Sequence, residues 1–106
     1  MSYIKYKKNN LFVENISVKR LISKYESPFY LYSKANIVEN YEAFYSNFKK
    51  VDPLICFSVK ANSNVQILKI LKKMGSGADV VSGGELIKTL KSGIKPNKIV
   101  FSGVGK

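Results

Sequence analysis

From residue 33 onward, segments with helical periodicity alternate with short apolar segments that are rich in β-forming residues. The predicted order is helix, strand, helix, strand, helix, strand, with strands at 54–60, 78–81 and 99–102. Such alternation is typical of parallel strands covered by helices, so it predicts an α/β fold. Because a closed α/β barrel has about 250 residues, three strands would leave its sheet incomplete. We therefore expect the 106 residues to be the N-terminal part of a larger protein.

The residues before this region are polar and rich in tyrosine. Three short elements are predicted among them: a strand at 11–13, a helix from an N-cap at Ser17 to Tyr25, and a strand at 29–32 after Pro28.

Each predicted helix of the alternating region has one apolar side. The residues expected to face inward are Ile37, Val38, Tyr41, Phe44, Tyr45 and Phe48 in the first helix, Ile67, Leu68, Leu71 and Met74 in the second, and Leu86, Ile87 and Leu90 in the third. Ser33 and the turn at 62–64 offer N-caps, while Gly75 and Gly93 suit the C-terminal ends of the second and third helices.

The formal charge of +11 comes from 18 basic residues against 7 acidic ones. A charge this high makes nucleic acid a candidate partner. However, the lysines are scattered over predicted polar helix faces, and Arg20 is the one arginine, although arginine is the better bidentate ligand for phosphate and guanine. A solvated, lysine-rich surface is therefore the favoured interpretation, and no nucleic-acid partner is predicted. Such a surface would also attract an anionic substrate or cofactor.

Cys56 is the one cysteine, which excludes an internal disulfide and fits a reducing compartment. The basic start is followed by only three apolar residues, 11–13, too few for a signal peptide or a membrane span. We therefore expect a cytoplasmic protein without a membrane partner. The absence of histidine excludes imidazole metal ligands and serine–histidine catalysis within these residues, and no metal site is predicted.

The predicted strand 54–60 ends in a lysine. Side-chain alternation would place Cys56, Ser58 and Lys60 on one face of this strand. A lysine at the carboxyl end of a buried parallel strand lies where α/β barrels carry catalytic groups. Burying its charge is costly unless it is paired, neutral or covalently engaged. The alternative is an ordinary strand-end lysine whose ammonium extends into solvent.

Two acidic residues near the next strand are further candidates. Asp79 interrupts an apolar run and would lie inward beside Lys60 if the strand faces match, where its carboxylate would stabilise the lysine charge. An ordinary salt-bridged aspartate is equally compatible. Ser82-Gly-Gly-Glu85 matches a capping box in which Glu85 reaches back to Ser82, although its glycines would also let a ligand approach the helix N-terminus. Gly103-Val-Gly105 alone is a weak phosphate-binding signal.

Three stretches together resemble the diaminopimelate decarboxylases. They are Phe57-Ser-Val-Lys-Ala-Asn62, Gly75-Ser-Gly-Ala-Asp-Val-Val-Ser-Gly-Gly-Glu-Leu86, and Val100-Phe-Ser-Gly103 with Gly105-Lys106. The stretch Glu26-Ser-Pro-Phe-Tyr-Leu-Tyr-Ser33 is similar to the same family, although Ser27 stands where threonine is more usual. The resemblance extends from about Leu11 to the last residue. The glycine pair before Glu85 is more similar to this family than to the ornithine decarboxylases of the same superfamily.

This resemblance implies a fold-type III pyridoxal-phosphate enzyme that works as a homodimer. Its fold would be an alanine-racemase-like (β/α)8 barrel with a β-sandwich domain. Residues 1–32 would belong to the β-sandwich domain, and residues 33–106 would form the first β/α units of the barrel. The histidine, phosphate loop, glutamate and partner-subunit residues of the family's site would lie outside these residues, so we expect the 106 residues alone to be inactive.

The resemblance also implies a reaction and a set of site residues. Lys60 matches the lysine that binds pyridoxal 5'-phosphate covalently, Ser58 matches a position lining the cofactor, and Asp79 and Glu85 match acidic positions that support the pocket. The implied reaction is decarboxylation of meso-2,6-diaminopimelate to L-lysine and CO2. The alternative is a related decarboxylase or racemase that acts on another basic amino acid. A basic nucleic-acid-binding module is a third, less favoured interpretation.

Overall fold

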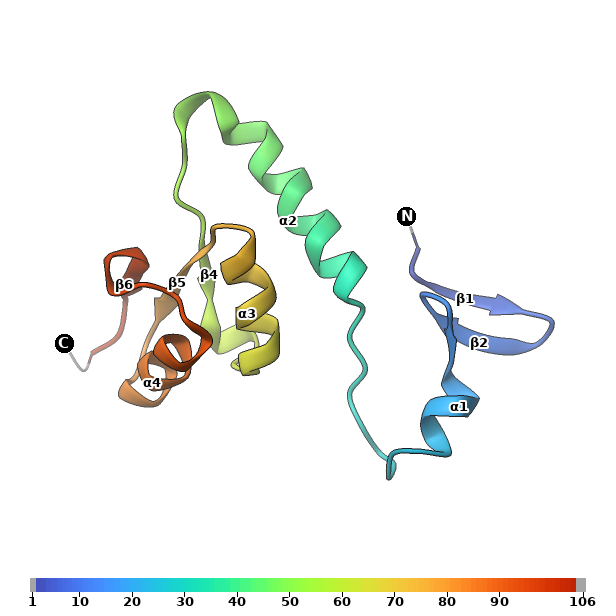
Figure 1. Cartoon of the computed structure of the whole chain (residues 1–106). Coiled ribbons are helices and arrows are strands. Elements are labelled where there is room, and N and C mark those ends of the chain that lie inside the picture. The colour runs from blue at the N-terminus through green and yellow to red at the C-terminus, as the bar shows by residue number, and fades with distance from the viewer. Residues whose placement is uncertain (1, 105–106) are drawn as a thin grey trace. The chain divides into compact units, whose positions relative to one another are not determined.

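The computed structural model describes residues 2–104, and the chain divides between Glu39 and Asn40 into two compact units (Figure 1). In chain order the strands and helices are β1 (Ile4–Lys7), β2 (Asn10–Val13), β3 (Ile16–Ser17), α1 (Val18–Ile22), α2 (Lys34–Phe48), β4 (Cys56–Ser58), α3 (Val65–Lys73), β5 (Gly77–Val80), α4 (Gly83–Ser92) and β6 (Ile99–Phe101). The division falls within α2, which begins in the N-terminal unit and ends in the C-terminal one.

The N-terminal unit is built on an antiparallel meander in the order β1-β2-β3. Lys8 and Asn9 form the turn between β1 and β2, and both have positive φ, 46° and 61°, as a tight two-residue hairpin turn requires. The strand predicted at 11–13 is confirmed within β2. The sequence pattern does not reveal β1, because all four of its residues are exposed and a strand without a buried face shows no alternation.

Helix α1 begins at the predicted cap and ends earlier than predicted. The Oγ of Ser17 accepts a hydrogen bond from the Arg20 N–H at 3.2 Å, which confirms the N-cap. The predicted extension to Tyr25 is wrong, since the last helical residue is Ile22. Ser23 follows, and its hydroxyl donates to the Arg20 carbonyl at 2.7 Å; such local bonds of serine compete with helix continuation.

The first turn of α2 is capped by two side chains. The predicted cap, Ser33, accepts from the Asn36 N–H at 3.0 Å. Glu14, which follows β2 with a φ of 54°, is the second capping residue. Its Oε1 accepts hydrogen bonds from the Ser33 hydroxyl at 2.7 Å and from the Ala35 N–H at 3.0 Å. A carboxylate at a helix N-terminus is favoured by the helix dipole. The hydrogen bond from Ala35, followed by that from Ser33, lowers the pKa of Glu14.

Two expectations for the residues around α2 are not met. Residues 29–32 were expected in a strand and form none; Tyr30 is 91% exposed and its ring stacks on that of Tyr32, with centroids 6.4 Å apart. The aromatic side of α2 is not buried within the described chain: the rings of Phe44 and Phe48 lie 5.1 Å apart and remain largely exposed. Helical periodicity predicts such a stripe without saying what covers it.

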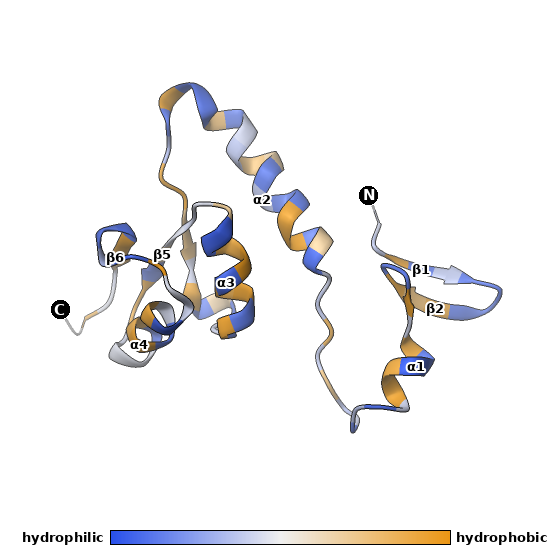
Figure 2. Ribbon diagram, in the orientation of Figure 1, coloured by the Kyte–Doolittle hydropathy of each residue, from blue (hydrophilic) through white to orange (hydrophobic). Residues whose placement is uncertain are grey.

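The C-terminal unit contains a parallel sheet in the order β4-β5-β6. This confirms the α/β arrangement predicted from the alternating pattern. In α3 the buried residues Ile67, Leu68 and Leu71 recur at helical spacing and form one apolar side, and the ribbon shows apolar and polar bands (Figure 2). The fully buried core consists of Val59, Leu68, Ala78, Val80 and Ile94, with Phe57, Leu86, Ile99 and Phe101 packed against it. The face of the sheet that carries Phe57, Ala78 and Val80 is therefore the face that α3 and α4 cover.

Two details of this unit differ from the predictions. The strand predicted at 54–60 is only three residues long, since the chain leaves β4 at Ser58 and enters a 3-10 helix at Val59–Ala61. In α4, Ile87 and Leu90 were expected inward but are exposed. The buried positions are Thr89 and Ser92, about two and three helical turns beyond the N-cap Ser82. Leu86, Thr89 and Ser92 recur every three residues and form the side of α4 that packs inward, so Ile87 and Leu90 lie outside it.

Gly77 permits the close approach of β5 to its neighbours. A Cβ at this position would overlap the carbonyl oxygen of Lys98 and lie 2.9 Å from the Cys56 Sγ. We predict that Gly77→Ala lowers the free energy of unfolding by about 1–3 kcal/mol, because the strands must separate to admit the methyl group. Gly83→Ala is the matched control, since nothing lies within 4 Å of its added Cβ. Denaturant unfolding of both variants measures this, and equal effects would contradict the account.

Glu14 gives the N-terminal unit a pH dependence. Because its pKa is lowered in the folded chain from an ordinary value of 4.5, its stabilisation is present above that value and is lost as the pH falls through the lower folded pKa. We predict that Glu14→Gln abolishes this acid-side loss and speeds hydrogen exchange of the Ala35 amide at neutral pH. Glu42→Gln, on the exposed surface of α2, is the control. Unchanged Ala35 exchange in Glu14→Gln would refute the cap.

Candidate functional site

The ends of β4 and β5 bring two predicted site residues together. Ser58 pairs with Asp79 in the parallel register, on the face of the sheet opposite Ala78 and Val80. The Ser58 hydroxyl donates to Asp79 Oδ2 at 3.5 Å, a long contact. The other carboxylate oxygen, Oδ1, is buried and has no partner among the described residues. Asp79 therefore has one oxygen available for a donor that these residues do not supply.

Cys56 lies on the same face, two residues before Ser58 and opposite Gly77. Burial, and then the negative charge of Asp79, raises the pKa of its thiol. The thiol is therefore protonated at neutral pH, and it contributes a small, neutral side chain beside the carboxylate. Strand alternation places this cysteine next to the site, but gives it no chemical role.

Lys60 lies just beyond the carboxyl end of β4, in the 3-10 helix rather than in the strand. The turn is closed by a hydrogen bond from the Asn62 N–H to the Val59 carbonyl at 3.1 Å, and the Val59 side chain is fully buried in the core. The backbone of Lys60 is thus held firmly while its side chain is exposed. Because the strand ends at Ser58, the side-chain alternation that predicted the direction of Lys60 does not extend to this residue. Among the described residues, the Lys60 ammonium forms no ion pair with Asp79.

Glu85 and Ser82 form the N-terminal cap of α4, with one change from the prediction. The Ser82 Oγ accepts from the Glu85 N–H at 3.2 Å, as in a capping box. The Glu85 carboxylate, however, accepts from the N–H of Val81 at 2.8 Å rather than from that of Ser82. This hydrogen bond reaches one residue further back than in a capping box and connects the first turn of α4 to Val81, the residue that follows β5. Glu85 thus supports the backbone beside Asp79.

A contact that the sequence does not predict joins α4 to the turn after Lys60. The Lys88 ammonium donates to the Ser63 hydroxyl at 2.9 Å. Asn64, in the same turn, caps α3 by accepting from the Gln66 N–H at 2.9 Å. A serine within a polar turn gives no sequence signal of such a partner. At the end of β6, Gly103 lies beside Val81, while Gly105 and Lys106, which belong to the resembling motif, lie outside the described residues.

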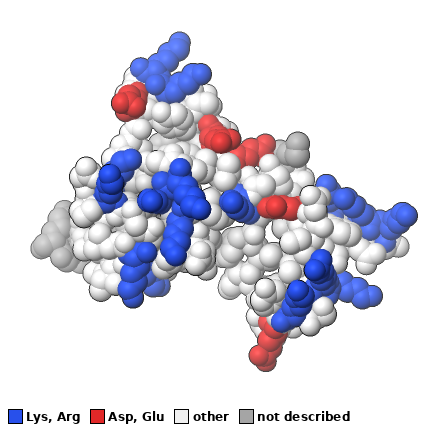
Figure 3. Space-filling model, in the orientation of Figure 1, with Lys and Arg blue, Asp and Glu red and all other residues white. Residues whose placement is uncertain are grey.

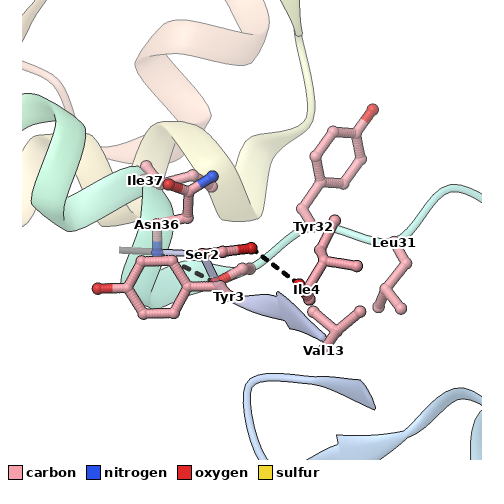
Figure 4. Close-up of a pocket in the computed structure, with 9 residues that line it drawn as sticks. Ser2, Tyr3, Ile4, Val13, Leu31, Tyr32, Asn36 and Ile37 are labelled. Carbon is pink, nitrogen blue, oxygen red and sulfur yellow. Dashed lines mark hydrogen bonds between the residues drawn. The ribbon is translucent and has the colours of Figure 1, made fainter. Parts of the chain in front are cut away.

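The N-terminal unit has a pocket of its own, of about 380 Å³ (Figure 4). It is lined by Ser2, Tyr3, Ile4, Val13, Leu31, Tyr32, Ser33, Asn36 and Ile37. The side chains of Ile4, Val13 and Leu31 lie close together, and the Ser2 hydroxyl donates a hydrogen bond to the Ile4 carbonyl at 2.8 Å. None of the four predicted site residues lines this pocket.

Residues 2–104 contain no group of three or more histidine, cysteine, aspartate or glutamate side chains placed to hold a metal ion. The same residues include no helix that is long and apolar enough to cross a membrane.

Comparison of the sequence with known proteins identifies the family to which this chain belongs. Residues 34–106 match the family described as pyridoxal-dependent decarboxylase, pyridoxal binding domain. The diaminopimelate decarboxylase of Aquifex aeolicus is 46% identical over 104 residues, which are 98% of this chain and 24% of that protein. That of Helicobacter pylori is 51% identical over 88 residues, 83% of this chain and 22% of that protein. The chain therefore spans about a quarter of the length of these relatives.

Solved structures agree. A crystal structure of a protein from Aquifex aeolicus superposes with a TM-score of 0.92 at 46% identity, covering 98% of this chain and 26% of that one. The diaminopimelate decarboxylase of M. jannaschii in complex with L-lysine gives 0.88 at 34% identity, covering 94% of this chain and 24% of that one. The recognised resemblance is confirmed, and the chain belongs to the family of pyridoxal-dependent decarboxylases, of which residues 34–106 match the pyridoxal-binding domain.

Proposed function

We propose that Lys60 holds pyridoxal 5'-phosphate covalently through its Nζ. The observation that carries this proposal is the unpartnered, buried Oδ1 of Asp79, on the strand next to the one that leads into Lys60. A buried carboxylate oxygen without a donor is costly, and a cationic nitrogen placed against it would remove that cost. The exposed Lys60 side chain and the unpartnered Oδ1 of Asp79 are therefore compatible with a ligand that carries a cationic nitrogen.

The residues around Lys60 have distinct tasks in this proposal. Lys60 binds the cofactor, and its amine, once free, exchanges a proton with the substrate. The Asp79 carboxylate would stabilise positive charge on a nitrogen of the bound cofactor, and Ser58 would orient that carboxylate through its hydroxyl. Glu85 holds the end of β5 in place through Val81. When bound, the cofactor supplies an aldehyde and a ring that accepts electrons from the bond being broken.

The reaction we propose is decarboxylation of meso-2,6-diaminopimelate to L-lysine and CO2 by the complete protein. The names of the relatives support this choice, as do the solved diaminopimelate decarboxylases from M. jannaschii and Helicobacter pylori in complex with L-lysine. We further propose that residues 33–106 form the first units of a (β/α)8 barrel, that residues 1–32 belong to a β-sandwich domain, and that the enzyme is a cytoplasmic homodimer.

A second candidate substrate class comes from one structural neighbour. The ornithine decarboxylase of Entamoeba histolytica superposes with a TM-score of 0.69 at 27% identity, covering 80% of this chain and 27% of that one. Decarboxylation of another basic amino acid is therefore the alternative. Release of CO2 from meso-2,6-diaminopimelate, measured against ornithine, arginine and lysine at equal concentration, separates the two.

Borohydride reduction tests the role of Lys60. This chain replaces the corresponding segment of the Aquifex aeolicus relative, and the chimera is incubated with pyridoxal phosphate and then reduced. We predict a single pyridoxyl group on Lys60, located by peptide mass spectrometry, and its loss in Lys60→Ala. Lys69→Ala removes an exposed lysine of α3 and is the matched control. Labelling spread over many lysines and unchanged in Lys60→Ala would reject the assignment.

Asp79→Asn tests the carboxylate in the same chimera. We predict that kcat/KM falls about 100-fold, because a neutral amide cannot stabilise the cationic nitrogen. The cofactor-free chain should not lose stability, since the substitution removes a carboxylate charge whose Oδ1 is buried without a donor among the described residues. Asp52→Asn is the control; Asp52 has a φ of 47°, a conformation that asparagine adopts readily. Reduced stability with unchanged kcat/KM would show a structural role instead.

A further inference from the structure

A second cavity lies at the opposite end of the sheet from Lys60. It has a volume of about 100 Å³ and is lined by Lys72, Ser76, Gly93, Ile94, Lys95 and Lys98. Ser76 directly precedes β5 and Lys98 directly precedes β6, so the cavity lies at the amino ends of these strands. Lys60 follows the carboxyl end of β4, and all three strands run parallel. The cavity is therefore separate from the candidate cofactor site.

Three of the six lining residues are lysines, and none is acidic. The Lys98 ammonium donates to the Gly75 carbonyl at 3.3 Å, which fixes it at the edge of the cavity. The Lys72 side chain passes close to Gly93: its Nζ would lie 3.9 Å from a Cβ added there. None of the three lysines forms a salt bridge with a carboxylate among the described residues. On the face in view, basic side chains far outnumber acidic ones (Figure 3).

The simplest explanation for these lysines is that they complement helix dipoles. Lys72 lies in the last turn of α3, and Gly93 ends α4, so two helix C-termini face this region. Each helix end carries about half a negative charge, which gives about one negative charge in total. Three ammonium groups exceed this by about two positive charges. The dipoles therefore account for only part of the charge around the cavity.

We propose that this cavity binds a divalent oxyanion, either inorganic phosphate or the phosphate group of a small phosphomonoester. The excess of about two positive charges matches a dianion, and lysine ammonium groups are effective phosphate ligands. Gly93 lies beside Lys72, since a Cβ added there would be in ordinary van der Waals contact with the Cε and Nζ of this lysine, at 3.7 and 3.9 Å. The cavity accommodates a tetrahedral oxyanion, while the remainder of an ester would extend into solvent. This proposal does not depend on the chemistry proposed for Lys60.

Phosphate titration of the isotopically labelled whole chain, followed by NMR, tests the site. At constant ionic strength, we expect saturable shifts of the amides from Gly93 to Lys98 with inorganic phosphate and none with chloride. Lys72→Gln with Lys95→Gln should weaken binding at least about tenfold, because two charged contacts are lost. Glycerol phosphate is titrated as a second ligand. Amide shifts equal to those from inorganic phosphate would show that the site also accepts phosphomonoesters, whereas weaker shifts would show that it prefers inorganic phosphate.

The matched control is Lys69→Gln with Lys73→Gln, which removes the same charge from exposed positions of α3 outside the cavity. It should bind phosphate as the unmodified chain does, and circular dichroism verifies that both double variants fold. Lys60→Ala should also keep the response, so failure of the cofactor proposal leaves this one intact. Equal weakening in the two double variants, or shifts that chloride reproduces, would overturn the phosphate site.

Discussion

The parallel register between β4 and β5 is the constraint on which the C-terminal unit depends. It sets Ser58 opposite Asp79 and Cys56 opposite Gly77, and so decides which side chains share the small, polar face of the sheet. The same register turns Ala78 and Val80 toward the helices, where they are fully buried. A slip by one residue would exchange the two faces, burying Asp79 among apolar side chains. Core and candidate site therefore follow from a single alignment of two short strands.

Much of this unit could be predicted from the sequence because two periodicities alternate in it. The helical stripe of α3 and the caps at Asn64 and Gly75 are local signals, and the structure confirms them. The rotation of α4 could not be predicted in this way. Thr89 is buried and Ile87 is exposed, because the packed side of α4 is the one that carries Leu86, Thr89 and Ser92. Which side of α4 is buried therefore depends on tertiary packing, which the hydrophobicity of single residues did not predict.

The candidate site was predictable to the extent that it lies on regular structure. Strand alternation correctly predicts that Asp79 lies opposite Ala78 and Val80 and beside Ser58. It fails for Lys60, since the chain changes from a strand to a 3-10 helix one residue earlier. The bond between Lys88 and Ser63 links residues 25 positions apart, which no local pattern can reveal. Short-range rules thus identified the candidate site residues, while the turn that presents Lys60 required three-dimensional information.

Helix α2 depends on a residue that is distant in sequence. Its first turn is closed by Ser33 and by Glu14, the latter 20 residues before Lys34, the first residue of the helix. The match to the pyridoxal-binding domain begins at Lys34, beyond both of these residues. An excision at that boundary would leave the amide groups of the first turn without acceptors, and the helix would fray from its start. Any shortened version of this protein intended for crystallisation should therefore begin upstream of the meander.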